Sequence, residues 1–493
     1  MINKKSMMAG LLSFAIFVGS PLMASASELS EALEATQSIN TISIEASGQR
    51  FEPQQTLSPA SPPRHVSDYD VTTLWQPNEG QAEEQWRLKT VYPFPNNLAF
   101  KASYLNDRGV RSGRDGFRPN SDGPISGARL GAVMKDLWLT NPVLLLSMAD
   151  DEAVAGASTN PGTKTFTIHD TEWTISFDQS TGLPSSVTTI ESDPLEGVVT
   201  NSVQFEDWRM TDGVPFPYRL QQKINGQLVK REVRTAIAVN EAGADITLPD
   251  DTNALTPISE SEKLRGWEMS HFFLRRAMIG APSDGDESAK VEINKVGDGL
   301  YQITGSSHHN IVIEGRRGLA IVDAVWYPRR SEAILKALKA KWPRKPIRYV
   351  ILTHHHVDHT GGLSTYASLD ATVVTHSDNF EYFYNILKKT QAEAPRMRAV
   401  NGRLTIDGIG RSIELFDIPN NHAADMIGVY VPDAKTVINS DLYSPGRPTQ
   451  QPVWAAEFAA AVRYHGLDVE SHLGSHGNGA EPHENLLKLV HGE

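Results

Sequence analysis

Residues 351–362 read ILTHHHVDHTGG, and this segment constrains the fold more than any other part of the chain. The residues before it, PIRYVIL, are almost all apolar, which predicts a short strand buried on both faces. The histidines follow the carboxyl end of this strand, where α/β sheets place their ligands. His354 and His356 are two residues apart, so an extended backbone projects both imidazoles to one side and His355 to the other.

Asp358 and His359 follow one residue later, and Gly361 and Gly362 allow the chain to bend behind them. Imidazoles and a carboxylate that converge at a strand end suit zinc, which takes nitrogen and oxygen ligands. The alternative is a solvated histidine-rich tract that binds metal adventitiously. The order His-x-His-x-Asp-His, between a buried strand and two glycines, favours a built metal site.

This order resembles the signature of the metallo-β-lactamase superfamily, and the resemblance extends over about residues 290–480. It implies an α/β fold, an αββα sandwich with a metal site at one edge. Three further ligands are expected in that family, and the matching positions are His422 in DIPNNHAAD, Asp441 in TVINSDLY and His476 in LGSHGNG. By this resemblance the first metal is held by His354, His356 and His422, the second by Asp358, His359 and His476, and Asp441 bridges both.

The aspartate at 441 stands where β-lactamases of this superfamily use Cys or Ser, so the ligand set is similar to that of the glyoxalase II, lactonase and phosphodiesterase branches. The resemblance implies two Zn²⁺, with iron or manganese as alternative metals. It implies a hydrolase that directs a metal-bridging hydroxide at an ester, lactone, thioester or related bond of a small-molecule substrate. Asp358 is expected to be catalytic as well as a ligand, because it would orient the nucleophile.

Three further residues are candidates for the substrate pocket. His308 and His309 precede a predicted strand that starts near the site, although both could be ordinary surface histidines. Tyr443 follows Asp441 by two residues and could reach the substrate oxygen, but an aromatic residue at a strand end more often packs. No separate general acid is visible in the sequence.

The chain begins with Lys4 and Lys5, then an apolar stretch to about Met23 and the motif Ala24-Ser25-Ala26. This pattern predicts a secretory signal peptide over residues 1–26. The alternative, a membrane anchor, is disfavoured because the stretch is short and contains glycine and proline. With no cysteine for a lipid anchor, the chain is expected to be periplasmic or secreted, without stable membrane insertion after cleavage. A net charge of −13 disfavours nonspecific nucleic-acid binding.

The length of 493 residues predicts two domains after the signal peptide. Only three of the 16 histidines precede residue 300, which indicates that the two parts differ in chemistry. We predict an N-terminal domain over 27–280, a linker over 281–290 that is rich in Gly, Pro, Ser and Asp, and a catalytic domain over 291–493. Nothing in the sequence reports the oligomeric state.

The N-terminal domain is predicted to be an α+β domain built on a large antiparallel sheet. Residues 164–240 alternate apolar and polar positions, and Asn225-Gly226 marks a hairpin. This region weakly resembles the curved sheet of periplasmic lipoprotein carriers, which implies a half-barrel able to hold an apolar group. Two other functions therefore remain open: a periplasmic carrier with the metal domain as a scaffold, or an iron-dependent redox or sulfur-oxidising enzyme of the same fold. A mononuclear iron site would not need all seven ligands.

Overall fold

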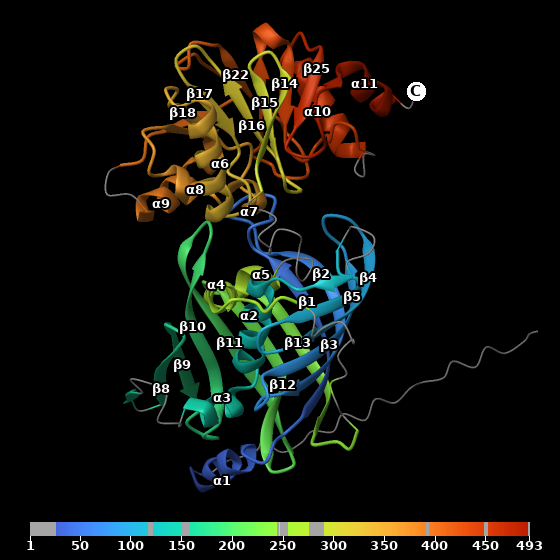
Figure 1. Cartoon of the computed structure of the whole chain (residues 1–493), viewed down its shortest axis with the longest axis vertical. Helices are drawn as coiled ribbons and strands as arrows, with labels where there is room; N and C mark the ends of the chain where they lie inside the picture. The colour runs from blue at the N-terminus through green and yellow to red at the C-terminus, as the bar shows by residue number, and fades with distance from the viewer. Residues whose placement is uncertain are drawn as a thin grey trace, which may run out of the picture.

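The computed structural model describes residues 26–116, 122–149, 158–160, 162–243, 246, 255–275, 290–390, 394–447 and 452–491. The chain forms two lobes, an N-terminal one drawn from blue to green and a C-terminal one drawn from yellow to red (Figure 1). The signal peptide, except Ala26, and the linker, except Lys290, lie outside the described residues. Among the described residues, no helix has the length and apolar character needed to cross a membrane.

The elements of the N-terminal lobe, in chain order, are α1 (Ala26–Thr36), β1 (Ile42–Glu52), β2 (Arg64–Gln76), β3 (Gln81–Thr90), β4 (Asn96–Tyr104), β5 (Gly109–Arg114), β6 (Gly123–Pro124), α2 (Gly127–Leu139), α3 (Pro142–Ala149), β7 (Ser158–Asn160), β8 (Thr163–Ile168), β9 (Thr171–Phe177), β10 (Pro184–Asp193), β11 (Gly197–Thr211), β12 (Val214–Ile224), β13 (Gln227–Val239), α4 (Glu260–Glu268) and α5 (Ser270–Arg275). These strands form one 13-stranded sheet in the order β6-β5-β4-β3-β2-β1-β13-β12-β11-β10-β9-β8-β7.

Every pairing in this sheet is antiparallel, which confirms the predicted large antiparallel sheet. All neighbouring strands are also consecutive in the chain, except where β1 pairs with β13. The predicted turn at Asn225-Gly226 joins β12 to β13, and both residues have positive φ. The sheet is therefore two meanders joined by their first and last strands.

The sheet curves around α2, α4 and α5 (Figure 1). Helix α2 begins after its N-cap Ser126 and buries apolar residues such as Leu130 and Val133 against the sheet. Buried ion pairs hold it there as well: Lys135 contacts Glu191 of β10 at 2.9 Å, and Arg129 contacts Asp115 at 2.7 Å. The inner face of the sheet is thus covered by a helix that is fixed by paired charges.

The elements of the C-terminal lobe are β14 (Glu292–Gly297), β15 (Leu300–Thr304), β16 (Asn310–Glu314), β17 (Leu319–Val322), α6 (Pro328–Lys341), β18 (Ile347–Ile351), α7 (Val357–Thr360), α8 (Leu363–Tyr366), β19 (Thr372–His376), η4 (Ser377–Asn379), α9 (Phe380–Thr390), β20 (Met397–Val400), β21 (Arg403–Ile406), β22 (Ile413–Asp417), β23 (Ile427–Val431), η5 (Pro432–Ala434), β24 (Thr436–Asn439), α10 (Pro452–Tyr464), β25 (Ser471–Gly474), β26 (Glu481–Pro482) and α11 (His483–His491). Strands β14 to β20 form a seven-stranded sheet and β21 to β26 a six-stranded sheet, each in chain order.

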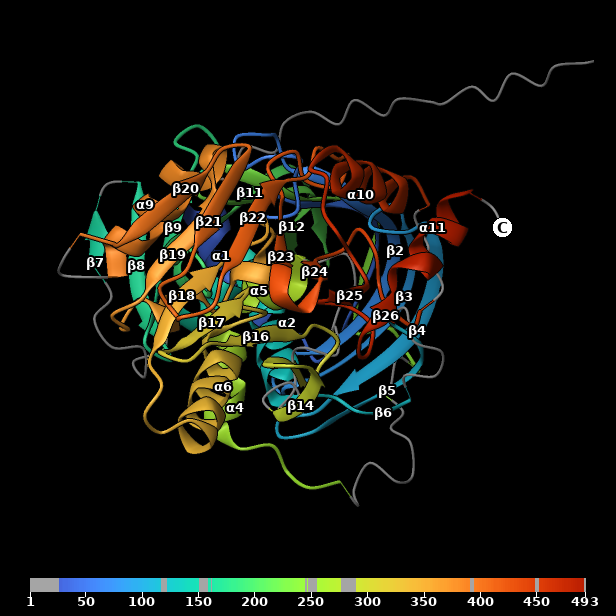
Figure 2. The same cartoon turned by 90° about the horizontal axis from the view of Figure 1, so that it is seen from above.

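The two sheets pack face to face through a cluster of buried aliphatic residues, among them Val322 and Ile351 from the first sheet and Val429 and Ile438 from the second. Helices α6 and α9 pack on the outer face of the first sheet, and α10 and α11 on that of the second (Figure 2). Helix α8 packs on the same face as α6 through Leu363 and Tyr366. This arrangement is the predicted αββα sandwich.

The two lobes meet near α7 (Figure 1). Residues 53–61, which connect β1 to β2 and are named the rim loop here, donate and accept hydrogen bonds with the segment around α7. A second contact joins Glu262 of α4 to Arg329 of α6 at 3.0 Å. The metal-site segment therefore lies at the boundary between the lobes.

Candidate metal centre

The histidine-rich segment begins where β18 ends. This strand lies in parallel between β17 and β19, so its carboxyl end opens at one edge of the first sheet. His354, His356 and His359 are fully buried there, and α7 carries Asp358 and His359. The apolar strand β18 thus places the histidine segment inside the lobe, and the short helix α7 turns Asp358 and His359 towards His354 and His356.

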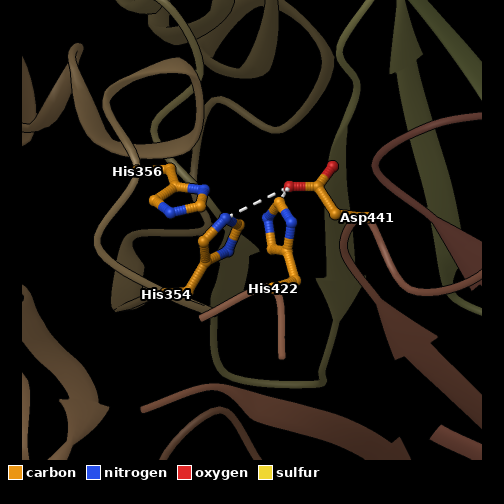
Figure 3. A group of neighbouring side chains, drawn as sticks. All are labelled: His354, His356, His422 and Asp441. Carbon is orange, nitrogen blue, oxygen red and sulfur yellow. Dashed lines mark ion pairs between the residues drawn. The ribbon is translucent and has the colours of Figure 1, made fainter. Parts of the chain in front are cut away.

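The remaining predicted ligands come from loops of the second sheet. His422 lies between β22 and β23, Asp441 follows β24, and His476 follows β25. Asp441 adopts a left-handed conformation with φ of 63°, an arrangement that Asp tolerates better than most residues. The edges of both sheets therefore supply side chains to one point, as Figure 3 shows for His354, His356, His422 and Asp441.

The carboxylate of Asp441 lies at the centre of this arrangement. Its Oδ2 atom is 3.2 Å from Nε2 of His354, 3.0 Å from Nε2 of His359 and 2.9 Å from Nε2 of His422. Its Oδ1 atom is 2.5 Å from Nε2 of His476. One carboxylate therefore touches histidines that were assigned by resemblance to both metals.

Among the residues that the structure describes, two groups bring their donor atoms close enough to share an ion. The first, named the four-residue group, contains His354, His356, His422 and Asp441. The second, named the three-residue group, contains His308, His359 and His476. Asp358, predicted for the second metal, lies next to this second group, since its Oδ2 accepts from Nε2 of His308 at 3.1 Å. The structure thus adds His308 beside the predicted second site.

The donor set fits a pair of metal ions. The Nε2 atoms of His354, His359 and His422 approach Asp441 closely, yet none has a hydrogen-bond partner among the described residues. Buried polar atoms without partners are costly, and imidazole nitrogens aimed at a shared carboxylate are the usual arrangement around a cation.

The opposite ring nitrogens are held by neighbours, which fixes each tautomer. Nδ1 of His359 donates to Asp323 at 3.1 Å, and Nδ1 of His354 lies 3.1 Å from the Thr353 hydroxyl. Nε2 of His356 donates to the Thr56 carbonyl at 2.8 Å, and its Nδ1 has no hydrogen-bond partner in the part of the chain that the structure describes. The rings of His354 and His356 therefore each present one unprotonated nitrogen to the site, and the bond to Asp323 directs Nε2 of His359 towards it.

Burial sets the protonation of the site. It lowers the pKa of His354 to about 4, helped by the charge of His359. Burial also lowers the pKa of His356, so both rings are neutral near pH 7, the form that ligates metal. His359 behaves differently: burial opposes its charge, but the carboxylates of Asp441 and Asp323 raise its pKa well above its ordinary value. The carboxylates thus favour positive charge at this point.

The other predicted pocket residues differ in position. The backbone N–H of His309 donates to the Ser475 carbonyl at 2.7 Å, which ties the start of β16 to the loop of His476. The hydroxyl of Tyr443 donates to Glu481 at 2.7 Å, so its proton is directed towards that carboxylate. His308 is the one of the three whose ring packs against the predicted ligands His359 and His476.

Two kinds of contributor were missed from the sequence. Asp323 directly follows β17, the parallel neighbour of β18, so the strand-end argument could have found it. Gln55, Thr56 and Tyr92 of the N-terminal lobe carry no local signal, because ordinary polar residues in a proline-rich segment are typical of surface loops. Their contacts depend on how the two lobes dock.

Residues 303–447 match the family model described as the metallo-beta-lactamase superfamily. The 2,4-dinitroanisole O-demethylase subunit alpha of Nocardioides sp. is 27% identical over 182 residues, which are 36% of this chain and 55% of that protein. The alkyl/aryl-sulfatase BDS1 of Saccharomyces cerevisiae is 39% identical over 70 residues, 14% of this chain and 11% of that protein. The linear primary-alkylsulfatase of Pseudomonas sp is 37% identical over 70 residues, 14% of this chain and 10% of that protein.

The chain therefore spans about half the length of the first of these relatives and about a tenth of the two sulfatases. Among solved structures, a metallo-beta-lactamase from Pontibacter korlensis covers 41% of this chain and 98% of its own, with 16% identity and a TM-score of 0.35.

Proposed function

Because residues 303–447 belong to the metallo-beta-lactamase superfamily, we propose that the chain is a dinuclear zinc hydrolase acting on an ester, lactone, thioester or related bond. The relatives named as sulfatases add sulfate esters to the bonds worth testing. The observation that carries the proposal is the carboxylate of Asp441, which lies within 3.2 Å of nitrogens from four histidines. Such convergence serves ion binding better than packing.

In this proposal the four-residue group would hold the first ion. His359 and His476 would hold the second, together with Asp358 or His308, and Asp441 lies close enough to both sets of histidines to serve both ions. Bound zinc supplies Lewis acidity and a water that ionises near neutral pH. Asp358 accepts hydrogen bonds from Gln55 and His308, so its two oxygens are held in fixed directions. That orientation suits a carboxylate that positions the attacking nucleophile and accepts its proton.

The O-demethylase relative gives a specific reason to keep a second candidate, an enzyme that removes a methyl group from an aryl ether, with iron-dependent redox chemistry among the alternatives. Metal analysis of protein purified without added metal separates these candidates. Two zinc ions per chain support the dinuclear hydrolase, whereas iron, or at most one ion, supports the redox alternative.

Activity is tested on a panel of lactones, thioesters, carboxylate esters, sulfate esters, phosphodiesters, β-lactams and a methyl aryl ether. We expect hydrolysis of at least one class by the wild type and its loss in Asp441→Asn and Asp358→Asn. His476→Asn should also lose hydrolytic activity. The matched control is His491→Asn, which changes an exposed histidine at the end of α11. Equal rates in wild type and Asp441→Asn would refute the hydrolytic function.

We further propose that the chain is exported to the periplasm or out of the cell and is cleaved after Ala26, because residues 1–26 carry the pattern of a signal peptide. Cell fractionation followed by N-terminal sequencing tests this. An intact N-terminus on cytoplasmic protein would contradict it.

A further inference from the structure

The rim loop of the N-terminal lobe lies directly against the candidate metal centre. The Gln54 carbonyl accepts from the backbone N–H of Val357 at 3.2 Å, and the Leu57 carbonyl accepts from that of Ala424 at 2.8 Å. Val357 follows the ligand His356, and Ala424 comes two residues after the ligand His422. The rim loop therefore bridges two ligand loops that belong to different sheets of the C-terminal lobe.

Thr56 stands between these two anchors and contacts the site itself. Its carbonyl accepts from Nε2 of His356 at 2.8 Å, so the proton of this ring lies on Nε2 and Nδ1 faces the other members of the four-residue group. A metal-ligating histidine usually donates its other nitrogen to a fixed acceptor, and that acceptor sets the tautomer and the ring orientation. For His356 the acceptor comes from the N-terminal lobe.

Gln55 and Tyr92 form a second connection, which runs between the two proposed ion sites. The side-chain amide of Gln55 donates through Nε2 to Asp358, and its Oε1 accepts from the Tyr92 hydroxyl at 3.3 Å. The Tyr92 oxygen in turn lies 3.5 Å from Nδ1 of His422. The directions agree along the whole chain: His422 Nδ1 donates to Tyr92, Tyr92 to Gln55, and Gln55 to Asp358.

That polarity leaves Nε2 of His422 unprotonated on the side of Asp441, 2.9 Å away, and it leaves Asp358 as an acceptor. Both are the forms that bind a cation. Hydrogen bonds aligned in one direction also polarise one another, which strengthens each of them.

The rim loop is itself held firmly. The side-chain amide of Gln54 donates to Asp193, the last residue of β10, at 3.2 Å and to Glu196, in the turn that follows, at 3.1 Å. Gln54, Gln55 and Thr56 are all buried, with no more than 8% of each residue exposed. A loop with these anchors can hold its neighbours in place, because its own side chains have little freedom to move.

We propose that the rim loop and Tyr92 are positioning elements of the metal centre, so that the N-terminal lobe helps to set its affinity for each ion. Tyr92 positions His422 of the four-residue group, and Gln55 positions Asp358 beside the second ion. This inference rests on the metal binding assumed in the proposed function, but it does not depend on which bond is cleaved.

The test uses full-length Tyr92→Phe and Gln55→Leu. The matched controls are Tyr464→Phe, at a tyrosine that is 86% exposed, and Gln85→Leu, at an exposed glutamine of β3. Two zinc dissociation constants are measured for each protein by competition with a chromophoric chelator, and the visible spectrum of the cobalt(II) form reports ligand geometry.

We expect each variant to lower the affinity for mainly one of the two ions by about 10- to 100-fold, the usual effect of removing a hydrogen-bond partner of a ligand. Tyr92→Phe should lower the affinity for the ion of the four-residue group, and Gln55→Leu should lower the affinity for the other ion. The cobalt spectrum should shift in both, and the controls should match the wild type.

Wild-type constants and spectra in both variants would overturn the proposal. Equal weakening of both ions in each variant would also overturn it, because that pattern indicates a general loosening of the fold. Should one variant fail to fold by circular dichroism, the other still decides the outcome through its own ion. A wild type that binds two zinc ions but hydrolyses nothing would refute the proposed function and leave this inference standing.

Discussion

Replacing Asp323 with Asn should weaken the binding of the second ion, although Asp323 is not among the residues proposed to hold an ion. Its Oδ1 accepts from the backbone N–H of Thr353 at 2.9 Å and from the Thr353 hydroxyl at 2.8 Å. Its Oδ2 accepts from Nδ1 of His359 at 3.1 Å and from the Ser440 hydroxyl at 2.6 Å. The carboxylate thus connects the end of β18, the ligand His359 and the residue before Asp441.

The Asp323→Asn variant would keep an oxygen to accept from Thr353 but lose the oxygen that accepts from Nδ1 of His359. Asparagine has the same shape, and it tolerates the positive φ of 65° at this position, so the backbone should not be strained. With the amide oxygen facing Thr353, the amide nitrogen faces His359 and disfavours a proton on Nδ1. The proton then moves to Nε2, the nitrogen that faces Asp441, and this tautomer cannot ligate metal there.

The expected loss is about 10- to 100-fold in zinc affinity for the second ion, or roughly 1.4 to 2.7 kcal/mol. That range agrees with the ~1.5–3 kcal/mol assigned to a hydrogen bond to a charged group. Chelator competition on the full chain measures it, with Asp433→Asn as the control, since Asp433 is an exposed aspartate that pairs with Arg411. A second-ion constant within about twofold of the wild type would refute the reasoning, because the tautomer of His359 would then not depend on Asp323.

Three further predictions concern stability. Lys135→Met should lower the free energy of unfolding by about 3 kcal/mol. This is the lower end of the cost of breaking a buried ion pair, because Glu191 keeps its bonds to Asn201 and His271. Urea unfolding followed by tryptophan fluorescence measures the change, and an unchanged midpoint would contradict the prediction. Burial alone would raise the pKa of Glu191, but the charge of Lys135 and the hydrogen bond from His271 lower it below its ordinary value. The ionised Glu191 therefore stabilises the fold fully above about pH 4.5, and this stabilisation is lost as the pH falls. Glu191→Gln should flatten the pH dependence of the melting temperature in acid, and a profile parallel to that of the wild type would argue against this. Removing metal with a chelator should lower the melting temperature, and zinc at about 100 times its dissociation constant should restore about 2.7 kcal/mol; no response to zinc would count against a folded metal site.

Local patterns were enough to predict an α/β fold with a large antiparallel sheet and to single out the segment with His354, His356, Asp358 and His359. The αββα arrangement and the ligands His422, Asp441 and His476 were implied by the resemblance to the superfamily. The apolar run before His354 predicted a buried strand, and β18 lies at the centre of a parallel set. Alternating residues and the Asn225-Gly226 turn predicted hairpins of a large sheet, which the structure confirms. These features depend on residues close together in the chain, where periodicity and turn chemistry decide the outcome.

One local detail was wrong for a physical reason. The segment SEAILKALKAKWP, with Ser331 as a residue type that favours the N-cap, predicts a helix that begins after Ser331, but α6 begins at Pro328 with Tyr327 in the cap position. Proline is favoured in the first turn because its missing N–H has no partner there and its φ already suits a helix. Ser331 is instead buried within the first turns of the helix.

What the sequence could not predict are contacts between distant parts of the chain. Thr56 and His356 are 300 residues apart, and their hydrogen bond exists only because the lobes dock in one orientation. The pairing of β1 with β13 has the same character, since Ile42 lies opposite Val239. Such contacts are selected by the packing of the whole chain, and no local preference of Gln, Thr or Tyr indicates them.

The geometry of the N-terminal lobe bears on how it can act. A carrier of apolar ligands would need an open inner face, but α2 covers this face and is fixed to it by two buried ion pairs, Arg129 with Asp115 and Lys135 with Glu191. Moving α2 aside would leave these charges buried without partners, which costs several kcal/mol for each broken pair. The rim of the sheet, in contrast, already contacts the ligand loops through Thr56. We therefore infer that the N-terminal lobe influences the metal centre from its rim and not by holding a ligand in its interior.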